Sequence, residues 1–197
     1  GFPEAALTVA IDQPSALLAV RLCDVAPNGE STLVSWGLLN LTHRESHEQP
    51  TALQPQKRYT VKVVLNVAGH QFQAGNRVPL AVSSTYWPNA WPSPVPFTGK
   101  LFTREASQLR LPIRPFLPED AALRPFPPPE SALAPRHERL RPLNTQRTKQ
   151  IDAETGRTDL ELIEDYGRVR LPGHHLEHEH RKKEVYSLVE GDPLSAT

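Results

Sequence analysis

Prolines concentrated in the middle of this chain restrict the folds that it can adopt. Of the 21 prolines in the 197 residues, fourteen fall between Pro79 and Pro142. Proline lacks an amide hydrogen and has a fixed φ, which excludes it from helix interiors and from central strands of a sheet. The stretch 74–94 therefore predicts a turn, a short strand with Pro79 at its start or edge, and a stiff loop that carries two Trp-Pro steps.

Short apolar runs separated by turn residues predict a β-rich chain. In residues 59–65, apolar side chains alternate with mostly polar ones, the period of two expected for a strand with one buried face. We expect further strands over 7–11, 17–25, 31–41, 78–83, 148–151 and 158–163. No segment combines apolar spacing at three and four residues with caps at both ends, so no long helix is predicted.

Turn residues indicate which of these strands pair. Asn28-Gly29 lies between two apolar runs, and both residues tolerate the positive φ of a tight hairpin turn. Gly75-Asn76 offers a second turn, and Gly156 a third, between the two last expected strands. Many short strands joined by turns are typical of an all-β sandwich or jelly roll. We predict a single β-sandwich domain over residues 1–197, with a long Pro-rich connection at 112–147 within it.

Composition limits the partners and the compartment. Lys plus Arg and Asp plus Glu are both 22, so no global field attracts nucleic acid or a membrane surface, and neither is expected as a partner. Cys23 is the single cysteine, which fits a reducing compartment. No apolar run reaches the roughly 18 residues that span a bilayer, and the N-terminus lacks the order of a signal peptide. We predict a cytoplasmic protein without a cofactor.

Two sets of residues have the side chains of catalytic or metal sites. Ser83 or Ser84 with His70 and Asp24 would suit nucleophilic hydrolysis, but the chain has no G-x-S-x-G elbow, so hydroxyls that close a strand are the favoured interpretation.

A second set is formed by His174, His178 and His180, which would lie on one side of an extended segment and are a weak alternative as metal ligands. We favour exposed strand histidines and predict no metal.

The aromatic residues Tyr86, Trp87 and Trp91 are the candidate contact residues. Indole and phenol rings combine a large apolar area with a polar tip, which suits partly wet interfaces. Three interpretations stay open: an interdomain contact, a platform that stacks on a sugar, or burial in the core. Since a proline follows each tryptophan and restrains the backbone of the residue before it, a rigid docking surface is expected.

Several blocks, in order and spacing, resemble one known family. They are Arg21–Ser31, Leu39–Arg44, Leu53–Pro55, Gly75–Arg77, Ser83–Pro88, Trp91–Pro94 and Gly191–Ser195. Together they are similar to the C-terminal domain of the Xaa-Pro dipeptidyl-peptidase and cocaine-esterase-like (CocE/NonD) hydrolases. The resemblance extends over nearly the whole sequence and is weakest from about 112 to 147.

This resemblance implies a jelly-roll, galactose-binding-like β-sandwich that follows an α/β-hydrolase domain in a serine hydrolase of ester, amide or X-Pro peptide bonds. The family's serine, histidine and aspartate belong to that other domain, so no catalytic residue is assigned here and the chain alone is expected to be inactive. Its expected partner is the α/β-hydrolase domain, against which it would help to shape the substrate cleft and the oligomer.

The ends of the chain favour a fragment of a larger hydrolase. It contains no methionine and opens on Gly1-Phe2-Pro3-Glu4. Family chains usually continue with further strands after a motif like 192–195, whereas this sequence stops at Thr197. Strand edges left unpaired invite a second copy, so we expect a homodimer. The rival function is a carbohydrate-binding module that uses Trp87 and Trp91.

Overall fold

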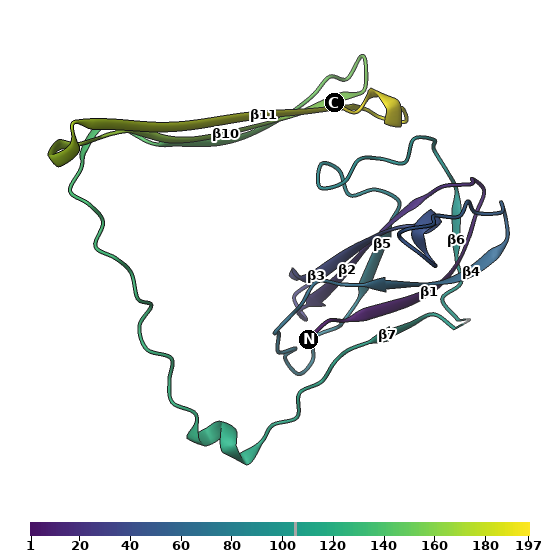
Figure 1. The fold of residues 1–197 in the computed structure, drawn as a ribbon. Coiled ribbons are helices and arrows are strands. Elements are labelled where there is room, and N and C mark those ends of the chain that lie inside the picture. The colour runs from purple at the N-terminus through teal and green to yellow at the C-terminus, as the bar shows by residue number, and fades with distance from the viewer. Residues whose placement is uncertain (105) are drawn as a thin grey trace. The chain divides into compact units, whose positions relative to one another are not determined.

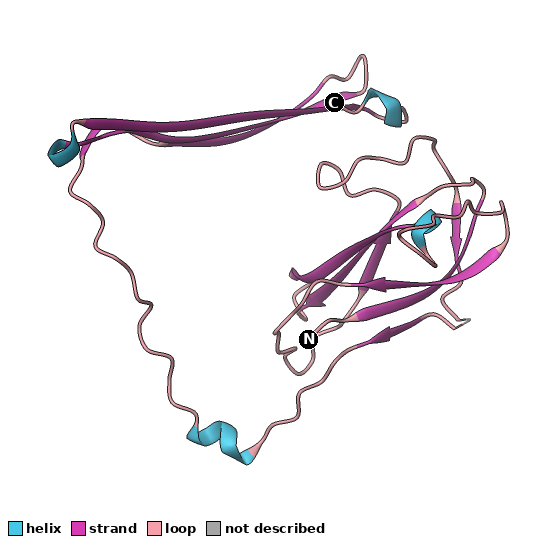
Figure 2. Ribbon diagram, in the orientation of Figure 1, coloured by secondary structure: helices cyan, strands magenta, loops and turns pink. Residues whose placement is uncertain are grey.

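The regular structure of the chain is almost entirely β-strand (Figure 2). The computed structural model describes residues 1–104 and 106–197. Within these residues every strand pairing is antiparallel. Short 3₁₀ turns make up the helical part of the same ranges: η1 (Leu41–His43), η2 (Pro118–Ala122), η3 (Pro172–His174) and η4 (Pro193–Ser195). The predicted all-β class is confirmed, and none of the helices described is long and apolar enough to cross a membrane.

The chain forms two compact units, Gly1–Arg114 and Pro115–Thr197. In Figure 1 the first unit runs from purple to teal and the second from green to yellow. The single domain that we expect over residues 1–197 would require these two units to form one sandwich, and it remains a prediction.

The first unit is a β-sandwich of two sheets. In one sheet the strand order is β4-β1-β6, and β7 also pairs with β1, while the other sheet has the order β3-β2-β5. Their bounds are β1 (Glu4–Ile11), β2 (Leu17–Val25), β3 (Ser31–Asn40), β4 (Arg58–Val64), β5 (Leu80–Ser83), β6 (Gly99–Leu101) and β7 (Gln108–Arg110). β6 and β7 share one edge of β1, because they pair with its two ends.

The core lies between these sheets and follows the alternation of the strands. Odd-numbered residues of β1 and β4 and even-numbered residues of β2 are buried in one hydrophobic cluster, since successive side chains of a strand point to opposite faces. The members with the least exposure include Ala5, Ile11, Val20, Leu22, Val63 and Leu65.

The two sheets approach each other closely along the side of β3 and β4. The amide of Asn66 donates to the carbonyl of Trp36 at 2.9 Å, and the hydroxyl of Ser35 donates to the carbonyl of Asn66 at 2.6 Å. A Cβ atom at Gly37 would lie only 2.5 Å from the carbonyl oxygen of Val64, so this approach requires glycine. The sandwich is therefore nearly closed on this side.

Most of the predicted strands of this unit are confirmed. β2 has the predicted bounds of 17–25, and it pairs with β3 through a turn in which Gly29 has a φ of 89°. The predicted alternation in 59–65 is confirmed, because Val61, Val63 and Leu65 are buried. The strand expected at 78–83 begins only at Leu80, after Pro79. β6 and β7 were not predicted, because both are three residues long and too short to show a period of two.

The second unit contains a separate sheet with the order β11-β10-β8, in which β9 also pairs with β10. Its strands are β8 (Glu138–Arg141), β9 (Asn144–Ile151), β10 (Arg157–Leu171) and β11 (Leu176–Val189). The predicted hairpin turn is confirmed, since β9 and β10 pair and Gly156 has a φ of 69°. The pairing of β10 with β11 shifts between Asp165 and Arg168, where Gly167 has a φ of 77°. Such a shift is a β-bulge, which bends the long strand.

The Pro-rich segment is shorter than the predicted connection of 112–147. Residues 138–141 form β8 and residues 144–147 begin β9, so the stretch without strands ends at 137. Several of its apolar side chains are exposed, among them Phe126 at 99% and Leu133 at 96%.

Candidate functional site

The Trp-Pro loop, residues 84–98, connects β5 of one sheet to β6 of the other. It is fixed near its end, because Ser93 Oγ accepts from the Leu17 amide at 3.0 Å and Asp12 Oδ1 accepts from the Thr98 amide at 2.8 Å. Within the loop, the Ala90 amide donates to the Tyr86 carbonyl at 3.0 Å. These bonds tie the loop to both sheets of the sandwich.

Tyr86 packs on the outer face of the β3-β2-β5 sheet. Its ring lies 5.4 Å from the ring of Trp36 at an interplanar angle of 55°, and the guanidinium of Arg21 lies 5.5 Å from its centroid. Arg21 and Trp36 are cross-strand partners on β2 and β3, so their side chains share this face. Tilted aromatic pairs and cation–π contacts both stabilise such an arrangement. Tyr86 therefore anchors the loop to the sheet.

The two tryptophans of the loop differ in exposure. Trp87 is half-buried, and the peptide bond between Trp87 and Pro88 is cis. Trp91 has 63% of its surface exposed, and Val95, four residues later, is 50% exposed. The structure thus places Trp91 on the surface of an anchored loop and keeps it out of the hydrophobic core.

Two of the side chains considered for nucleophilic hydrolysis do meet. His70 Nε2 lies 2.7 Å from Asp24 Oδ2, and Asn76 Nδ2 donates to Asp24 Oδ1 at 2.8 Å. The hydrogen bond from His70 holds the pKa of the Asp24 carboxyl below its usual value, against the effect of burial, and the bond from Asn76 lowers it further. A third partner, the ring of Phe72, meets the His70 ring edge-on at 4.8 Å. The cluster ties the segment 66–76 to β2.

The serines of that hypothesis lie elsewhere. Ser83 pairs with Ala19 on β2, five residues from Asp24 and so roughly 17 Å away along the strand. Its hydroxyl donates to the carbonyl of Thr85 at 2.9 Å. Ser83 and Ser84 line a small apolar hollow with Phe97 and Lys100, and none of the described residues around it is a histidine. The structure therefore does not assemble the Ser–His–Asp geometry that hydrolysis needs.

The three histidines considered as metal ligands are also not gathered. His174 ends η3, whereas His178 and His180 lie on β11, where the ring of His180 contacts the ring of Tyr166 at 5.4 Å. Among residues 1–104 and 106–197, no group of three His, Cys, Asp or Glu side chains is placed to hold a metal ion.

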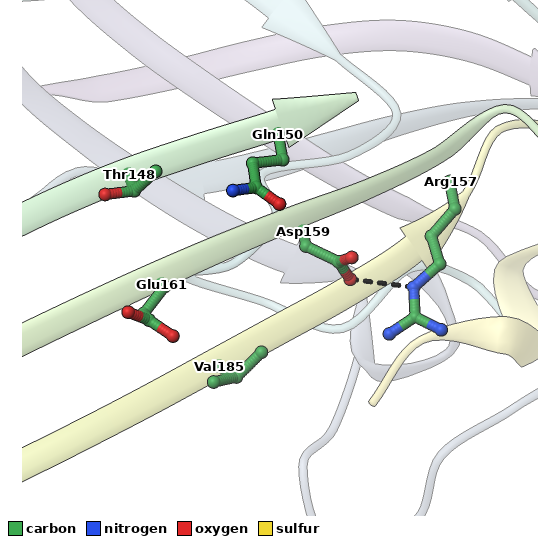
Figure 3. A pocket seen from close by; sticks show the side chains of 6 residues that line it. All are labelled: Thr148, Gln150, Arg157, Asp159, Glu161 and Val185. Atoms are coloured by element: carbon green, nitrogen blue, oxygen red, sulfur yellow. Dashed lines mark hydrogen bonds and ion pairs between the residues drawn. The ribbon is translucent and has the colours of Figure 1, made fainter. Parts of the chain in front are cut away.

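A shallow groove crosses one face of the second unit's sheet (Figure 3). Its lining includes Asp159 and Glu161 from β10, Gln150 from β9 and Val185 from β11. Asp159 already accepts hydrogen bonds from Ser187 and Arg157, which lower its pKa. Glu161, the other carboxylate of the lining, lies 2.6 Å from Lys183 Nζ. Both acids of the groove therefore already have partners within the sheet.

Sequence reasoning identified the loop but missed the cluster of Asp24, His70 and Asn76 as a structural unit. Asp24 and His70 are 46 residues apart, and only the tertiary fold brings them together. A charged residue in an apolar strand was the one signal available, because a buried carboxylate needs a partner.

Comparisons with known proteins give one family and several solved structures. The family described as "X-Pro dipeptidyl-peptidase C-terminal non-catalytic domain" matches residues 1–108. No curated protein matches. A selenomethionine-labelled α-amino acid ester hydrolase is 28% identical at a TM-score of 0.43, over 45% of this chain and 16% of that chain. An aminopeptidase from a marine sediment archaeon, Thaumarchaeota archaeon, is 25% identical with the same TM-score and coverage. The chain thus spans about a sixth of the length of these two structures.

Proposed function

Because the chain belongs to the X-Pro dipeptidyl-peptidase C-terminal non-catalytic domain family, we propose that it is the accessory β-sandwich of a serine hydrolase that cleaves ester, amide or X-Pro peptide bonds. The sandwich packs on an α/β-hydrolase domain of the same parent chain and helps to shape its substrate cleft and oligomer. The chain itself has no hydrolytic activity and needs no cofactor. Its topology is a galactose-binding-like jelly roll, and its compartment is the cytoplasm, in keeping with the single cysteine, Cys23.

The observation that carries the docking proposal is the exposure of Trp91 on an anchored loop. A fixed loop loses little conformational entropy when a partner covers it, so less of the free energy gained by burying its apolar area is offset. Tryptophan is among the residues that contribute most at protein interfaces. Tyr86 holds the same loop on the sheet through its contacts with Trp36 and Arg21, and Trp87 is half-buried.

The test uses the catalytic region of the parent gene, expressed separately, and titrates it with the chain. Trp91→Ala is expected to weaken the association about tenfold or more, because truncation of a buried interface tryptophan removes a large contact area. Hydrogen exchange of residues 84–98 is expected to slow on binding. Unchanged exchange in this loop, together with wild-type affinity of Trp91→Ala, would contradict the docking role.

Phe2→Ala is the matched control. Phe2 is aromatic and 62% exposed, nearly the same as Trp91, but it lies outside the Trp-Pro loop. This variant is expected to bind the catalytic region with the affinity of the wild-type chain. If both variants weaken binding equally, the loop has no special role.

The second candidate function is a carbohydrate-binding module that uses Trp87 and Trp91. The same exposed indole favours it, because aromatic faces stack on the apolar faces of sugars. A titration with soluble glycans, followed by tryptophan fluorescence, separates the two functions. A saturable change that is lost in Trp87→Ala would favour the module over the hydrolase accessory domain.

A further inference from the structure

We propose that two copies of the chain pair through strand β11, in an antiparallel register centred on His180. This inference concerns the second unit and is independent of the proposed function of the first. It specifies a strand and a register for the homodimer that unpaired edges lead us to expect.

β11 presents a long free edge. In the part of the chain that the structure describes, β10 is the strand that pairs with β11, and no strand pairs with its other edge. The far end of this edge is covered, because Ser187 and Thr197 exchange two backbone hydrogen bonds of 3.0 Å. Along a strand, the backbone N–H and C=O groups of every second residue point to the same side. Since Ser187 directs its groups toward Thr197, the odd-numbered residues from 177 to 185 also direct theirs away from β10.

The charges of β11 form blocks on one face of the sheet. Glu177 and Glu179 are followed by Arg181 and Lys183, and residues two apart on a strand share a face. When this strand opposes its own copy antiparallel about His180, Glu177 meets Lys183 of the second copy and Glu179 meets its Arg181. Twofold symmetry repeats both contacts, and cross-strand pairs of opposite charge stabilise a sheet.

The same charges disfavour the neighbouring registers. A shift of the twofold axis by one residue places Glu179 or Arg181 opposite itself. A shift by two places Glu177 opposite Glu179, or Arg181 opposite Lys183. Like charges directly opposite each other destabilise strand pairing, so the register centred on His180 is selected.

The other long edge of the sheet lacks this complementarity. The charged residues of β9 are Arg147 and Lys149, both basic, so two copies of β9 have no acidic partner to offer each other. Pairing of β11 with β9 of another copy would leave edges free and would build an open filament. Self-pairing of β11 ends at two copies.

Existing ion pairs of β11 do not prevent this pairing. Glu177 already contacts Arg168 and Arg170, and Lys183 lies 2.6 Å from Glu161. These side chains are at least partly exposed, where ion pairs are weak and a carboxylate accepts from more than one donor. Glu179 and Arg181 have longer contacts, at 3.5 Å to Arg141 and 3.9 Å to Asp165, and both keep more than half of their own side-chain surface exposed. The charged side chains of β11 can therefore keep their present partners and also form ion pairs with the second copy.

The first experiment measures self-association of the full chain by sedimentation velocity. The wild-type chain is expected to form a dimer and no larger species at high micromolar concentration. Glu177→Lys and Lys183→Glu each turn two opposite-charge pairs into like-charge pairs, which is expected to weaken dimerisation about tenfold.

An equimolar mixture of the two variants is expected to regain wild-type affinity, because every pair is again of opposite charge. The matched control, Lys149→Glu on β9, is expected to leave the dimer unchanged.

The second experiment reads the register directly and does not depend on charge. With Cys23 replaced by Ser, His180→Cys places two thiols opposite each other across the twofold axis, at a spacing suited to a disulfide. It is expected to cross-link on oxidation, whereas Lys182→Cys, which faces His178 of the second copy, is not. The proposal is overturned if the wild-type chain stays monomeric, if it grows to species larger than a dimer, or if the mixture of Glu177→Lys and Lys183→Glu fails to regain affinity. Equal cross-linking of the two cysteine variants would also overturn it.

Discussion

Asp24 shows how one buried charge is accommodated in an apolar strand. The residue is 8% exposed, and its carboxylate accepts hydrogen bonds from His70 and Asn76. A buried carboxylate without such partners would destabilise the fold strongly, because desolvation disfavours the charged form. The hydrogen bonds therefore explain both why this residue is tolerated on β2 and how the segment 66–76 is held.

The lowered pKa of Asp24 gives a pH-dependent prediction. A carboxyl whose pKa is lower in the folded than in the unfolded protein stabilises the fold above its unfolded pKa of about 3.9 and loses this effect as pH falls through the folded pKa. Asp24→Asn is expected to lower the melting temperature of the first unit by about 5 °C at neutral pH. The difference from wild type is expected to narrow below about pH 4.

Tryptophan fluorescence suits this measurement, because all three tryptophans, Trp36, Trp87 and Trp91, lie in the first unit. Glu45→Gln, a change at an exposed carboxylate, serves as the control and is expected to melt like the wild-type chain. A pH-independent difference for Asp24→Asn would show that the charge of Asp24 does not stabilise the fold.

At the scale of elements, the bulge in β10 shapes the second unit. Asp165 pairs with Arg141 and also accepts from the amide of Gly167 at 2.8 Å, and both bonds lower its pKa. Gly167 has a positive φ, and a Cβ atom there would lie 2.4 Å from the carbonyl oxygen of Arg141. The bend of the strand thus depends on a glycine with backbone packed against it.

Gly167→Ala is expected to destabilise the second unit by at least about 2 kcal/mol, since it combines a strained φ with a backbone clash. Hydrogen exchange of the β9 and β10 amides in urea checks this. Gly173→Ala is the control, because a Cβ atom at Gly173 would meet no heavy atom within 4 Å beyond its chain neighbours, and it is expected to stay within about 0.5 kcal/mol of wild type. Equal protection in the two variants would show that the bulge carries no strain.

Elements with their own sequence signal were predictable, and elements defined by tertiary contacts were not. β2 and the turn at Gly29 have apolar alternation and turn residues, and both appear where the sequence indicates them. β6 and β7 are three residues each and, among the described residues, pair with the ends of β1, so no periodicity reveals them. The exposure of Trp91 was likewise unpredictable, because a Trp-Pro pattern is compatible with core, interface and ligand contact.

At the scale of the whole molecule, each of the two units forms its own sheets: β1 to β7 belong to the first unit and β8 to β11 to the second. The large hydrophobic cluster consists of residues from the first unit, from Ala5 to Leu65, and Val82, Phe97, Leu109 and Leu111 are among the side chains packed against it. A chain cut after Arg114 is therefore expected to keep the melting temperature of the first unit within about 3 °C. Tryptophan fluorescence on heating checks this, and a large loss of stability would instead favour the single domain that the sequence indicates over residues 1–197.

The central claim is that the chain supports hydrolysis carried out by another domain. An assay of X-Pro p-nitroanilide hydrolysis tests it most directly, with the chain alone and with the catalytic region of its parent gene. The account predicts no turnover by residues 1–197 alone, and turnover by the combination that is unchanged by Ser83→Ala or Ser84→Ala. Turnover by the chain alone that either serine substitution abolishes would contradict the account.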